Sequence, residues 1–474
     1  MSKLDNPVSP YLELEQTTAN LEYGQSITIK PTSINDQNPI YTYESLNPEI
    51  ATVDEATGVV TAVDYEGEAT IVAKIAATEN YQAGQTEFKV TIDTPEEKTP
   101  LSFEAVEDCK ITVKFLGNPG LEKPIVAISN GVKQEITETT EIEVVKGQKV
   151  RFFSENAATA KNYDNNLVTI LANEKECYIY GNVMSMVTPA GSEFKDNTAF
   201  TANYALAGLF YKPSGYSNKI ISHPTKKLLL PATTLTDYCY DNLFNGCSIL
   251  DAGPEILPAT ALTASCYYGM FKGCKKLKKA PTISATQMVG SAACRQMFYQ
   301  CEALTTAPAL NVTSINSNCY QQMFYGCTSL TTAPEKLPAE NLYNQCYASM
   351  FQGCTSLATV SANMLPAETL NSNCYNQMFR DCTSLTSAPE LPALTANVSN
   401  CYRQMFYGCT NLNYVKCLAT KRNSSTYQWL EGVAASGTFV KNSEMGTQTT
   451  SGNNIWQLGN SQGIPAGWTV VNAD

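Results

Sequence analysis

Histidine is almost absent from this chain, whose 474 residues contain only His223. The commonest general base of enzymes and the commonest zinc ligand are therefore missing everywhere else. The sequence also has no nucleophile elbow, phosphate-binding glycine loop, HExxH motif or EF-hand loop. Carboxylates are sparse in the C-terminal half and are not paired by spacing, so a glycosidase would have no acid and base. We expect a protein that is not an enzyme and that holds no cofactor and no metal.

Basic charge and long apolar runs are also scarce. The net charge is −12, and residues 1–100 hold this whole imbalance, with 17 acidic and 5 basic side chains. The neutral remainder lacks the basic patch with which nucleic-acid-binding proteins neutralise phosphates, so no nucleic-acid partner is expected. No apolar run approaches the roughly 18 residues of a membrane helix, which predicts no membrane-spanning segment. The first residues contain no apolar signal-peptide core, so an export signal would have been removed or replaced.

Short strands dominate the first part of the chain. After an N-terminal tail (residues 1–9), β-branched runs separated by Gly, Pro, Asn and Asp predict a β-sandwich over residues 10–95. Within it, Asp54 to Gly58 is predicted to close a hairpin. The stretches "SLNPEIATVDEATGVVTAV" and "GEATIVAKIAATENYQAG" resemble the bacterial immunoglobulin-like domain of group two. This resemblance implies a spacer or adhesion module on the outside of a bacterium.

A second all-β domain is predicted over residues 100–187. Apolar residues alternate with polar ones from Cys109 onward, and "EIEVVKGQKVRFF" is typical of a hairpin that turns at Lys146 and Gly147. Cys109 and Cys177 both fall in expected strands. They could form a disulfide or remain two buried thiols, and the spacing does not decide between these alternatives.

Repeats occupy residues 188–412. Seven copies of a phrase such as "CYQQMFYGCTSLTTAP" recur every 26 to 28 residues, and Leu209-Phe210 marks a degenerate opening copy. A period of this length predicts a solenoid, followed by a C-terminal cap over residues 413–474. Within one copy, Cys319, Met323 and Cys327 are spaced as one stripe of a short helix, and "LTTAP" is typical of a strand. The predicted fold is therefore multidomain, with an α/β solenoid after two β-domains.

The recurring cysteines are interpreted as a buried core ladder. Two cysteines eight residues apart on a helix are separated by roughly 12 Å, beyond the reach of a disulfide, and their spacing is wider than in zinc sites. Free cysteine is small and apolar enough for a core. In the third copy, Ala293 takes the first cysteine place and Cys294 the tyrosine place, a swap that packing tolerates better than ligation would. The ladder is predicted to consist of Cys239, Cys247, Cys266, Cys274, Cys301, Cys319, Cys327, Cys346, Cys354, Cys374, Cys382, Cys401 and Cys409.

The Phe, Gly, Cys and Leu of "MFYGCTSL" resemble BspA-like leucine-rich repeats, which occur on surface proteins of anaerobic gut and oral bacteria. The likeness covers about 200 residues of the array. It implies a location outside the cell and a binding role, and it makes the chain a candidate lipoprotein. Likeness of fold alone does not specify a ligand.

The residues after each repeat leucine are expected to form an open, hydroxyl-rich face of the stack. Such a face suits binding, although threonine is also common on exposed strands. "FKGCKKLKKAP" places five lysines in one copy, which suits either an anionic ligand or the acidic first domain, or else an ordinary solvated face. The candidate binding residues are Lys278, Lys279, Thr305, Thr306, Thr331, Thr332, Thr359, Thr386, Ser387, Asn413 and Tyr414.

All three tryptophans, Trp429, Trp456 and Trp468, follow the repeats. They are interpreted as parts of the cap, with exposed platforms for sugars as the alternative. Together these features predict a secreted protein of the bacterial cell surface that presents the repeats to host protein or extracellular matrix. A glycan-binding surface protein for polysaccharide capture is the second hypothesis, and an unrecognised hydrolase is the third.

Overall fold

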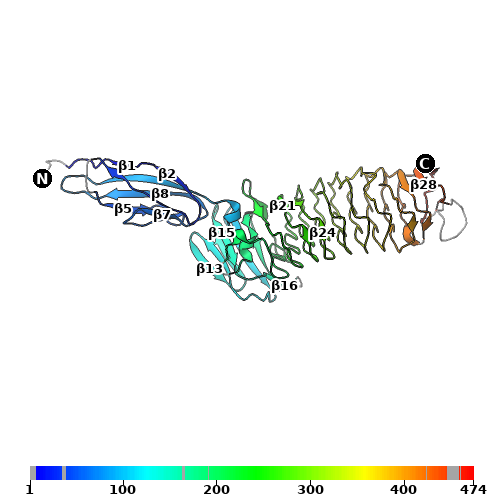
Figure 1. Ribbon diagram of the computed structural model, residues 1–474, viewed down its shortest axis with the longest axis horizontal. Coiled ribbons are helices and arrows are strands. Elements are labelled where there is room, and N and C mark those ends of the chain that lie inside the picture. Colours follow the sequence, from blue (N-terminus) through cyan, green and yellow to red (C-terminus); the bar gives the residue numbers. More distant parts are fainter. Residues whose placement is uncertain are drawn as a thin grey trace. The chain divides into compact units, whose positions relative to one another are not determined.

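The chain divides into two compact units, which we describe separately (Figure 1). The first comprises residues 1–99 with 127–134, and the second residues 100–126 with 135–474. The computed structural model describes residues 7–34, 39–162, 166–189, 192–422, 424–445, 458–459 and 461–473.

Strands, turns and bends make up nearly all of the described residues, which contain no α-helix. The predicted α/β leucine-rich-repeat solenoid is therefore wrong, because the segment expected to form a helix in each repeat is a series of turns. The helical segments that are described are short 3-10 turns: η1 (Glu96–Lys98), η2 (Val183–Met186), η3 (Phe194–Asp196) and η4 (Ser424–Thr426).

The first unit contains two larger sheets and a two-stranded one. The four-stranded sheet has the order β2-β9-β8-β5, the three-stranded sheet β3-β7-β6, and β1 pairs with β4. Both larger sheets supply buried side chains to one apolar cluster, including Val60 of β7, Ile71 of β8 and Phe88 of β9. The strands are β1 (Leu12–Glu13), β2 (Thr18–Leu21), β3 (Ser26–Thr28), β4 (Thr32–Ser33), β5 (Tyr41–Ser45), β6 (Ala51–Val53), β7 (Val59–Ala62), β8 (Glu66–Ile75) and β9 (Gly84–Asp93).

The hairpin predicted at Asp54 to Gly58 is present. Strands β6 and β7 pair antiparallel, with Val53 opposite Val60. The backbone N–H of Gly58 donates to the carbonyl of Asp54 at 3.0 Å, and Gly58 has a φ of 69°. Glycine suits this position because an added Cβ would lie 2.6 Å from the carbonyl oxygen of Ile29.

The N-terminal part of the second unit contains two sheets. One has the order β14-β11-β17-β16, and in the other β10 lies between β15 and β18. Strands β12 and β13 are neighbours in one sheet. These strands are β10 (Ser102–Ala105), β11 (Cys109–Leu116), β12 (Ile125–Ser129), β13 (Val132–Ile136), β14 (Thr140–Val144), β15 (Lys149–Ser154), β16 (Ala160–Asn162), β17 (Asn166–Ala172) and β18 (Cys177–Asn182).

The predicted hairpin at Lys146 and Gly147 is wrong. The chain does turn there, with a φ of 76° at Gly147, but β14 pairs with β11 whereas β15 pairs with β10. The turn therefore carries the chain from one sheet to the other. A turn signal between two alternating runs does not distinguish these outcomes, because both need the same reversal of direction.

The repeats begin directly on the second of these sheets. Strands β19 (Ile220–Ser222) and β20 (Leu228–Leu229) both pair parallel with β18. On the other sheet, the backbone N–H of Ile170 in β17 donates to the carbonyl of Leu209 at 2.7 Å. Residues 199–441, which we call the repeat array, thus continue the β-structure that precedes them.

Consecutive turns replace the expected helix in each repeat. In the fourth copy, Tyr320 and Gln322 donate their backbone N–H groups to Cys346 and Ala348 of the next repeat, both at 2.9 Å. Met323, which follows Gln322, instead donates its backbone N–H to the carbonyl of Tyr320, three residues earlier, at 3.2 Å. An α-helix would direct all of these N–H groups to the carbonyl four residues back. Successive repeats are therefore joined by backbone hydrogen bonds along the whole turn segment.

Short parallel strand pairs connect the repeats on their other sides. The "LTTAP" segments expected to be strands form isolated bridges, such as Thr306 with Thr332. Regular pairs in the array are β21 (Ile256–Leu257) with β23 (Thr282–Ile283), β22 (Ala261–Leu262) with β24 (Gln287–Met288), and β25 (Thr395–Ala396) with β27 (Lys421–Arg422). A three-stranded sheet of β26 (Tyr414–Cys417), β28 (Gly437–Lys441) and β29 (Trp468–Asn472) ends the array.

Identical side chains stack along the core of the array. The Phe rings from Phe210 to Phe406 lie one above the next, with centroids 5.2–5.6 Å apart. The second cysteine of each copy donates its thiol to the carbonyl of the Phe in the preceding repeat, as Cys327 does to Phe298 at 3.1 Å. All the cysteines of the predicted ladder are buried and free. Each repeat therefore completes the core of its neighbour.

Candidate functional site

The residues predicted to bind lie on the surface of the repeat array. All of them are exposed except Ser387, which is half-buried. We call this set the exposed row: Lys278, Lys279, Thr305, Thr306, Thr331, Thr332, Thr359, Thr386, Ser387, Asn413 and Tyr414. Backbone contacts between repeats join its members, since Thr306 bridges Thr332 and Ser387 bridges Tyr414.

The repeat leucine fixes the place of the row in each copy. Leu304 and Leu330 are fully buried, whereas the two residues that follow each of them are exposed. Alternation along a strand would have turned one residue of each pair inward. Because the chain does not extend as a regular strand there, both side chains of each pair reach solvent.

Some hydroxyl groups of the exposed row have a hydrogen-bond partner within the protein, and others have none. Thr331 donates its Oγ1 to the carbonyl of Thr305 at 3.2 Å, and Thr386 donates to Ala358 at 3.3 Å. These two hydroxyls therefore help to join successive repeats. Within the described part of the chain, Thr305 and Thr306 have no hydrogen-bond partner for their hydroxyls. Their oxygens remain free to bind a ligand.

One cavity opens on the exposed row. It has a volume of about 590 Å³ and includes Lys278, Lys279, Thr305 and Thr306 in its lining. Its walls also include the apolar residues Pro281, Ile283, Ala307 and Pro308, with the Asn311 amide nearby. We call it the lysine–threonine cavity. Its size falls within the range of small-molecule sites, roughly 300–1,000 Å³.

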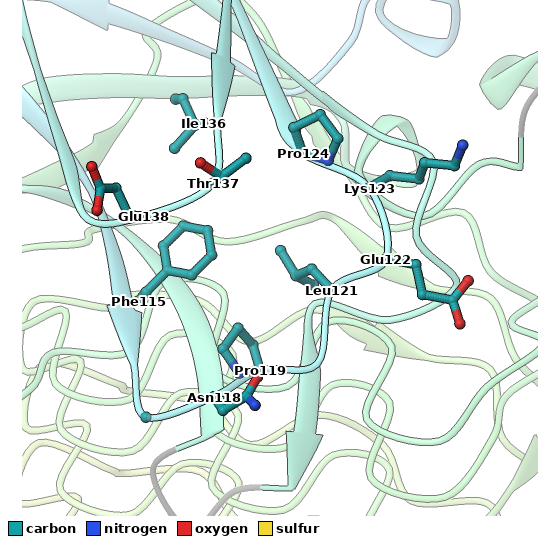
Figure 2. Close-up of a pocket in the computed structure, with 11 residues that line it drawn as sticks. Phe115, Asn118, Pro119, Leu121, Glu122, Lys123, Pro124, Ile136, Thr137 and Glu138 are labelled. Atoms are coloured by element: carbon teal, nitrogen blue, oxygen red, sulfur yellow. The ribbon is translucent and has the colours of Figure 1, made fainter.

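A second cavity, of about 410 Å³, lies in the β-structure that precedes the array. Figure 2 shows Phe115, Leu121 and Pro124 around it, with the carboxylate of Glu138 at one side. Its lining mixes apolar side chains with the polar side chains of Asn118, Glu122, Lys123, Thr137 and Glu138. It thus contains two carboxylates, whereas the lining of the lysine–threonine cavity contains none.

A third cavity, of about 420 Å³, contains His223. The Nδ1 atom of His223 accepts the backbone N–H of Lys226 at 3.0 Å, and its ring meets Tyr180 edge to face. Ser222 donates its hydroxyl to Asp251 at 2.7 Å, so its proton is directed to a carboxylate and not to the histidine. This arrangement is typical of a local structural network, since a nucleophilic serine would donate to the imidazole.

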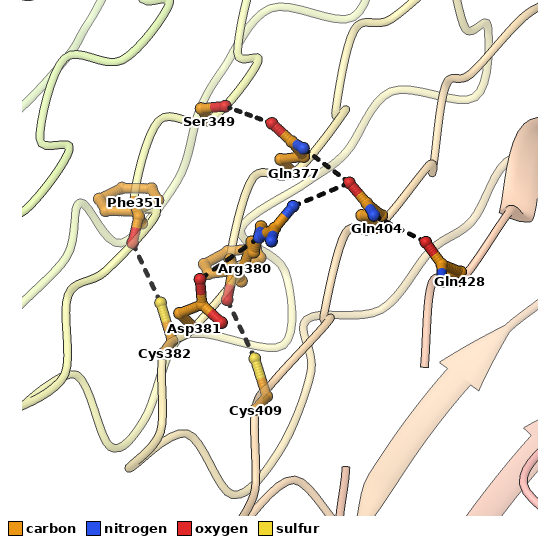
Figure 3. A network of polar contacts seen from close by, with 10 residues as sticks. Ser349, Phe351, Gln377, Arg380, Asp381, Cys382, Gln404, Cys409 and Gln428 are labelled. Atoms are coloured by element: carbon orange, nitrogen blue, oxygen red, sulfur yellow. Dashed lines mark hydrogen bonds and ion pairs between the residues drawn. The ribbon is translucent and has the colours of Figure 1, made fainter. Parts of the chain in front are cut away.

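A polar network along the turn segments, in which Ser349 and Gln404 are buried, was not predicted from the sequence. Gln377 donates to Gln404 at 2.7 Å, Gln404 donates to Gln428 at 2.8 Å, and Arg380 donates to Gln404 at 2.9 Å (Figure 3). Ser349 extends the chain of contacts to the preceding repeat. These side chains hold successive repeats in register, because the amide N–H of each glutamine donates to the amide oxygen of the next.

The backbone explains which residues occupy this network. Asn318, Gln322 and Gly326 all have positive φ, at 59°, 56° and 70°. The left-handed region is unfavourable for most residues but accessible to Gly and tolerated by Asn. A recurrence of Asn, Gln and Gly every four residues was therefore the signal in the sequence that could have indicated turns.

The tryptophans in the described part are buried at the end of the array. Trp429 donates its indole N–H to the carbonyl of Gly463 at 2.7 Å, and Trp468 donates to Ala434 at 2.8 Å. Trp429 also follows Tyr402 in a ladder of buried tyrosines. Trp456 lies outside the described residues. Neither described tryptophan offers a free ring face to a sugar.

No protein-family model and no curated protein sequence matched this chain. The likenesses to a bacterial immunoglobulin-like domain and to BspA-like repeats thus remain predictions from the sequence. Among the described residues, no group of His, Cys, Asp and Glu is arranged to hold a metal ion. In the same residues, no helix has the length and apolar character needed to cross a membrane.

Proposed function

We propose that this chain is a secreted binding protein of the bacterial cell surface, which presents the repeat array to host protein or extracellular matrix. The observation that carries the proposal is the exposed row, which places solvent-exposed polar side chains at the same point on successive repeats. The sequence resemblance to immunoglobulin-like and BspA-like surface modules supports the location outside the cell.

The length of the row suits a macromolecular partner. Stacked Phe rings are 5.5–5.6 Å apart along the repeats that carry the row. From Lys278 to Tyr414 the row therefore extends over roughly 25–30 Å, the length scale of a standard protein–protein interface. Exposed Thr and Asn side chains provide hydrogen bonds without the desolvation cost of buried charges.

Binding of the full chain to immobilised matrix proteins tests this proposal. Thr332→Glu with Thr359→Glu changes two exposed members of the row, and Thr313→Glu with Ser314→Glu is the matched control at exposed positions outside it. We expect the row variant to bind at least about tenfold more weakly, because each added carboxylate would have to be desolvated in the interface. Equal binding by the row variant and the control variant would contradict a role for the row.

Glycan binding is the second candidate, and the lysine–threonine cavity favours it. A cavity of about 590 Å³ with apolar walls and free hydroxyls is better suited to a small ligand than to a flat protein surface. A glycan array compared with the panel of matrix proteins separates the two candidates. Turnover of any substrate would contradict both, since each proposes binding without catalysis.

The proposed location has its own test. A gene start that encodes a signal peptide, with a lipid-anchoring cysteine at its end, would support display on the cell surface. Protease accessibility of the chain on intact cells of the source bacterium gives a second measurement. Protection from protease in intact cells, and digestion only after lysis, would contradict display.

A further inference from the structure

The geometry points to an anionic saccharide, carboxylated or sulfated, as the ligand of the lysine–threonine cavity. This inference rests on the proposed binding function and specifies a ligand class for one part of the exposed row. Three properties of the cavity support it: the charge beside it, the hydrogen-bonding groups of its lining and its apolar walls.

Positive charge is concentrated in one repeat beside this cavity. Two lysines of that repeat already have partners: Lys275 lies 2.7 Å from Glu302, and Lys272 donates to Gln296 at 2.9 Å. Lys278 and Lys279 line the cavity and have no acidic partner among the described residues. Two free ammonium groups at the edge of one cavity favour a ligand that carries negative charge.

Hydrogen-bonding groups lie beside these charges. Thr305 and Thr306 can each donate and accept through a free hydroxyl, and the side chain of Asn311 offers both an amide N–H and a carbonyl oxygen. Sugar hydroxyls also donate and accept at the same atom, so they match this set. A sulfate ion only accepts hydrogen bonds, so it would leave the acceptors of the lining unpaired.

The walls of the cavity are apolar. Pro281, Ile283, Ala307 and Pro308 provide C–H surface between the polar groups. A pyranose ring has apolar C–H faces as well as polar edges, so it can contact such walls while its hydroxyls meet the threonines. At about 590 Å³ the cavity is also far larger than an isolated inorganic anion requires.

The lysines of the cavity around His223 differ from Lys278 and Lys279, because they have acidic partners. There, Lys227 lies 3.0 Å from Glu255 and Lys226 lies 3.7 Å from Glu104. Its cationic groups are therefore compensated by carboxylates of the protein itself. Lys278 and Lys279 are therefore the positions for the test, and Lys227, whose charge is compensated, is the position for the control.

Calorimetric titration of the full chain tests the inference with three probes: tetragalacturonate, a chondroitin sulfate tetrasaccharide and neutral maltotetraose. We expect at least one of the two anionic probes to bind and maltotetraose to bind at least about tenfold more weakly. Affinity for the anionic probe should fall as salt is raised from 50 to 300 mM, roughly as expected for screened surface charges. Equal affinity for the neutral and anionic probes would overturn the inference.

Variants locate the binding. Lys278→Ala with Lys279→Ala should weaken the anionic probe at least about tenfold, whereas Lys227→Ala should leave its affinity unchanged. Lys278→Arg with Lys279→Arg should retain most of the affinity, because it keeps the charge. Thr305→Val with Thr306→Val should weaken binding without changing its salt dependence. Unchanged affinity in the double alanine variant would overturn the assignment to this cavity.

The outcomes separate this inference from the proposed function. Binding of matrix protein without binding of any anionic probe would overturn the ligand class and leave the proposed function standing. Absence of binding to both would contradict both. A poly-glutamate peptide that binds more tightly than either anionic saccharide, and that loses affinity in the double alanine variant, would replace the saccharide with an acidic protein as the ligand.

Discussion

The sulfur atoms of Cys109 and Cys177 lie 3.4 Å apart, although their residues belong to strands of two different sheets. Cys109 begins β11 and Cys177 begins β18, and both side chains are buried. Burial raises the pKa of both thiols, so both are protonated near neutral pH. The pair therefore joins the two sheets of the second unit at one point, as two thiols in contact.

Refolding in the presence of glutathione disulfide is expected to convert this pair into a disulfide. Two thiols would lose two electrons and two protons to the glutathione disulfide, which becomes two glutathione molecules. With the two cysteines 68 positions apart in the sequence, the cross-link would stabilise the second unit by roughly 4 kcal/mol in the chain-entropy model. Peptide mapping under non-reducing conditions should show Cys109 linked to Cys177. A cross-link between repeat cysteines in place of this one would contradict the prediction.

The strands around this pair could be predicted, but their pairing could not. Alternation from Cys109 onward indicates β11, and the Lys146-Gly147 turn indicates where the chain reverses. Alternation describes one strand and its two faces, however, and contains no information on which other strand lies beside it. For this reason, a disulfide between Cys109 and Cys177 could not be decided from the sequence. For the same reason, a hairpin was predicted where the chain in fact crosses from one sheet to the other.

The repeats illustrate a different limit. Cys319, Met323 and Cys327 do point to the core together, as the predicted stripe required. A spacing of four residues is shared by an α-helix and by consecutive turns, so periodicity alone could not distinguish them. The deciding information was the Asn and Gly at positive φ, which are less favourable within a helix than Gln, the third residue type at these positions. The contents of the core were thus predictable, and the backbone that carries them was not.

The candidate site was predictable as a set of residues and not as a shape. Because the repeat leucine is buried, the positions after it could be placed at the surface from the sequence. Which of their hydroxyls would serve neighbouring repeats, and where a cavity would form, depends on contacts between repeats. Such contacts follow from the path of the backbone, which was wrongly predicted to form a helix in each repeat.

Native-state thiol labelling should report the burial of the cysteine ladder. Cys327 is fully buried, and burial raises its pKa to about 12, so thiolate is scarce at pH 8. We expect Ellman's reagent to label almost no repeat cysteine in the native protein at pH 8. After unfolding in guanidinium chloride under reducing conditions, followed by removal of the reductant, all 17 cysteines should react. Rapid labelling of several thiols before unfolding would contradict a packed ladder.

The carboxyl group of Asp241 should make the array more stable in acid than in base. Asp241 is 1% exposed, and burial raises its pKa from 3.8 to about 8. The folded state therefore holds a proton that the unfolded state releases above about pH 4, so this contribution is complete below pH 4 and is lost as the pH rises to 8. Asp241→Asn cannot ionise, and its Oδ1 can still accept from Asn242, as Asp241 does at 2.7 Å.

We expect the melting temperature of Asp241→Asn to exceed that of the parent chain by at least about 3 °C at pH 8 and to match it near pH 4. The difference should grow between these values and remain constant above pH 9. Asp237→Asn, a half-buried residue of the same repeat, is the control that corrects for a general loss of negative charge. A difference that does not vary with pH would show that Asp241 does not carry the effect.

Gln404 distinguishes the observed turns from the helix that its sequence context predicts. Its side chain accepts from Gln377 and Arg380 and donates to Gln428, while its backbone has a φ of 51°. Gln404→Ala should therefore destabilise the array by about 2 kcal/mol through the lost hydrogen bonds. Gln404→Gly loses the same bonds, but it should be more stable than the alanine variant by about 1 kcal/mol because glycine adopts positive φ without strain.

In an α-helix the order would be reversed, since glycine costs roughly 1 kcal/mol relative to alanine there. Arg403 provides the matched control, because it neighbours Gln404 but does not have positive φ. At that position alanine should be the more stable substitution. Urea unfolding of the four variants measures both differences at once. Alanine more stable than glycine at both positions would contradict the left-handed backbone at Gln404, and with it the series of turns that places each repeat against the next.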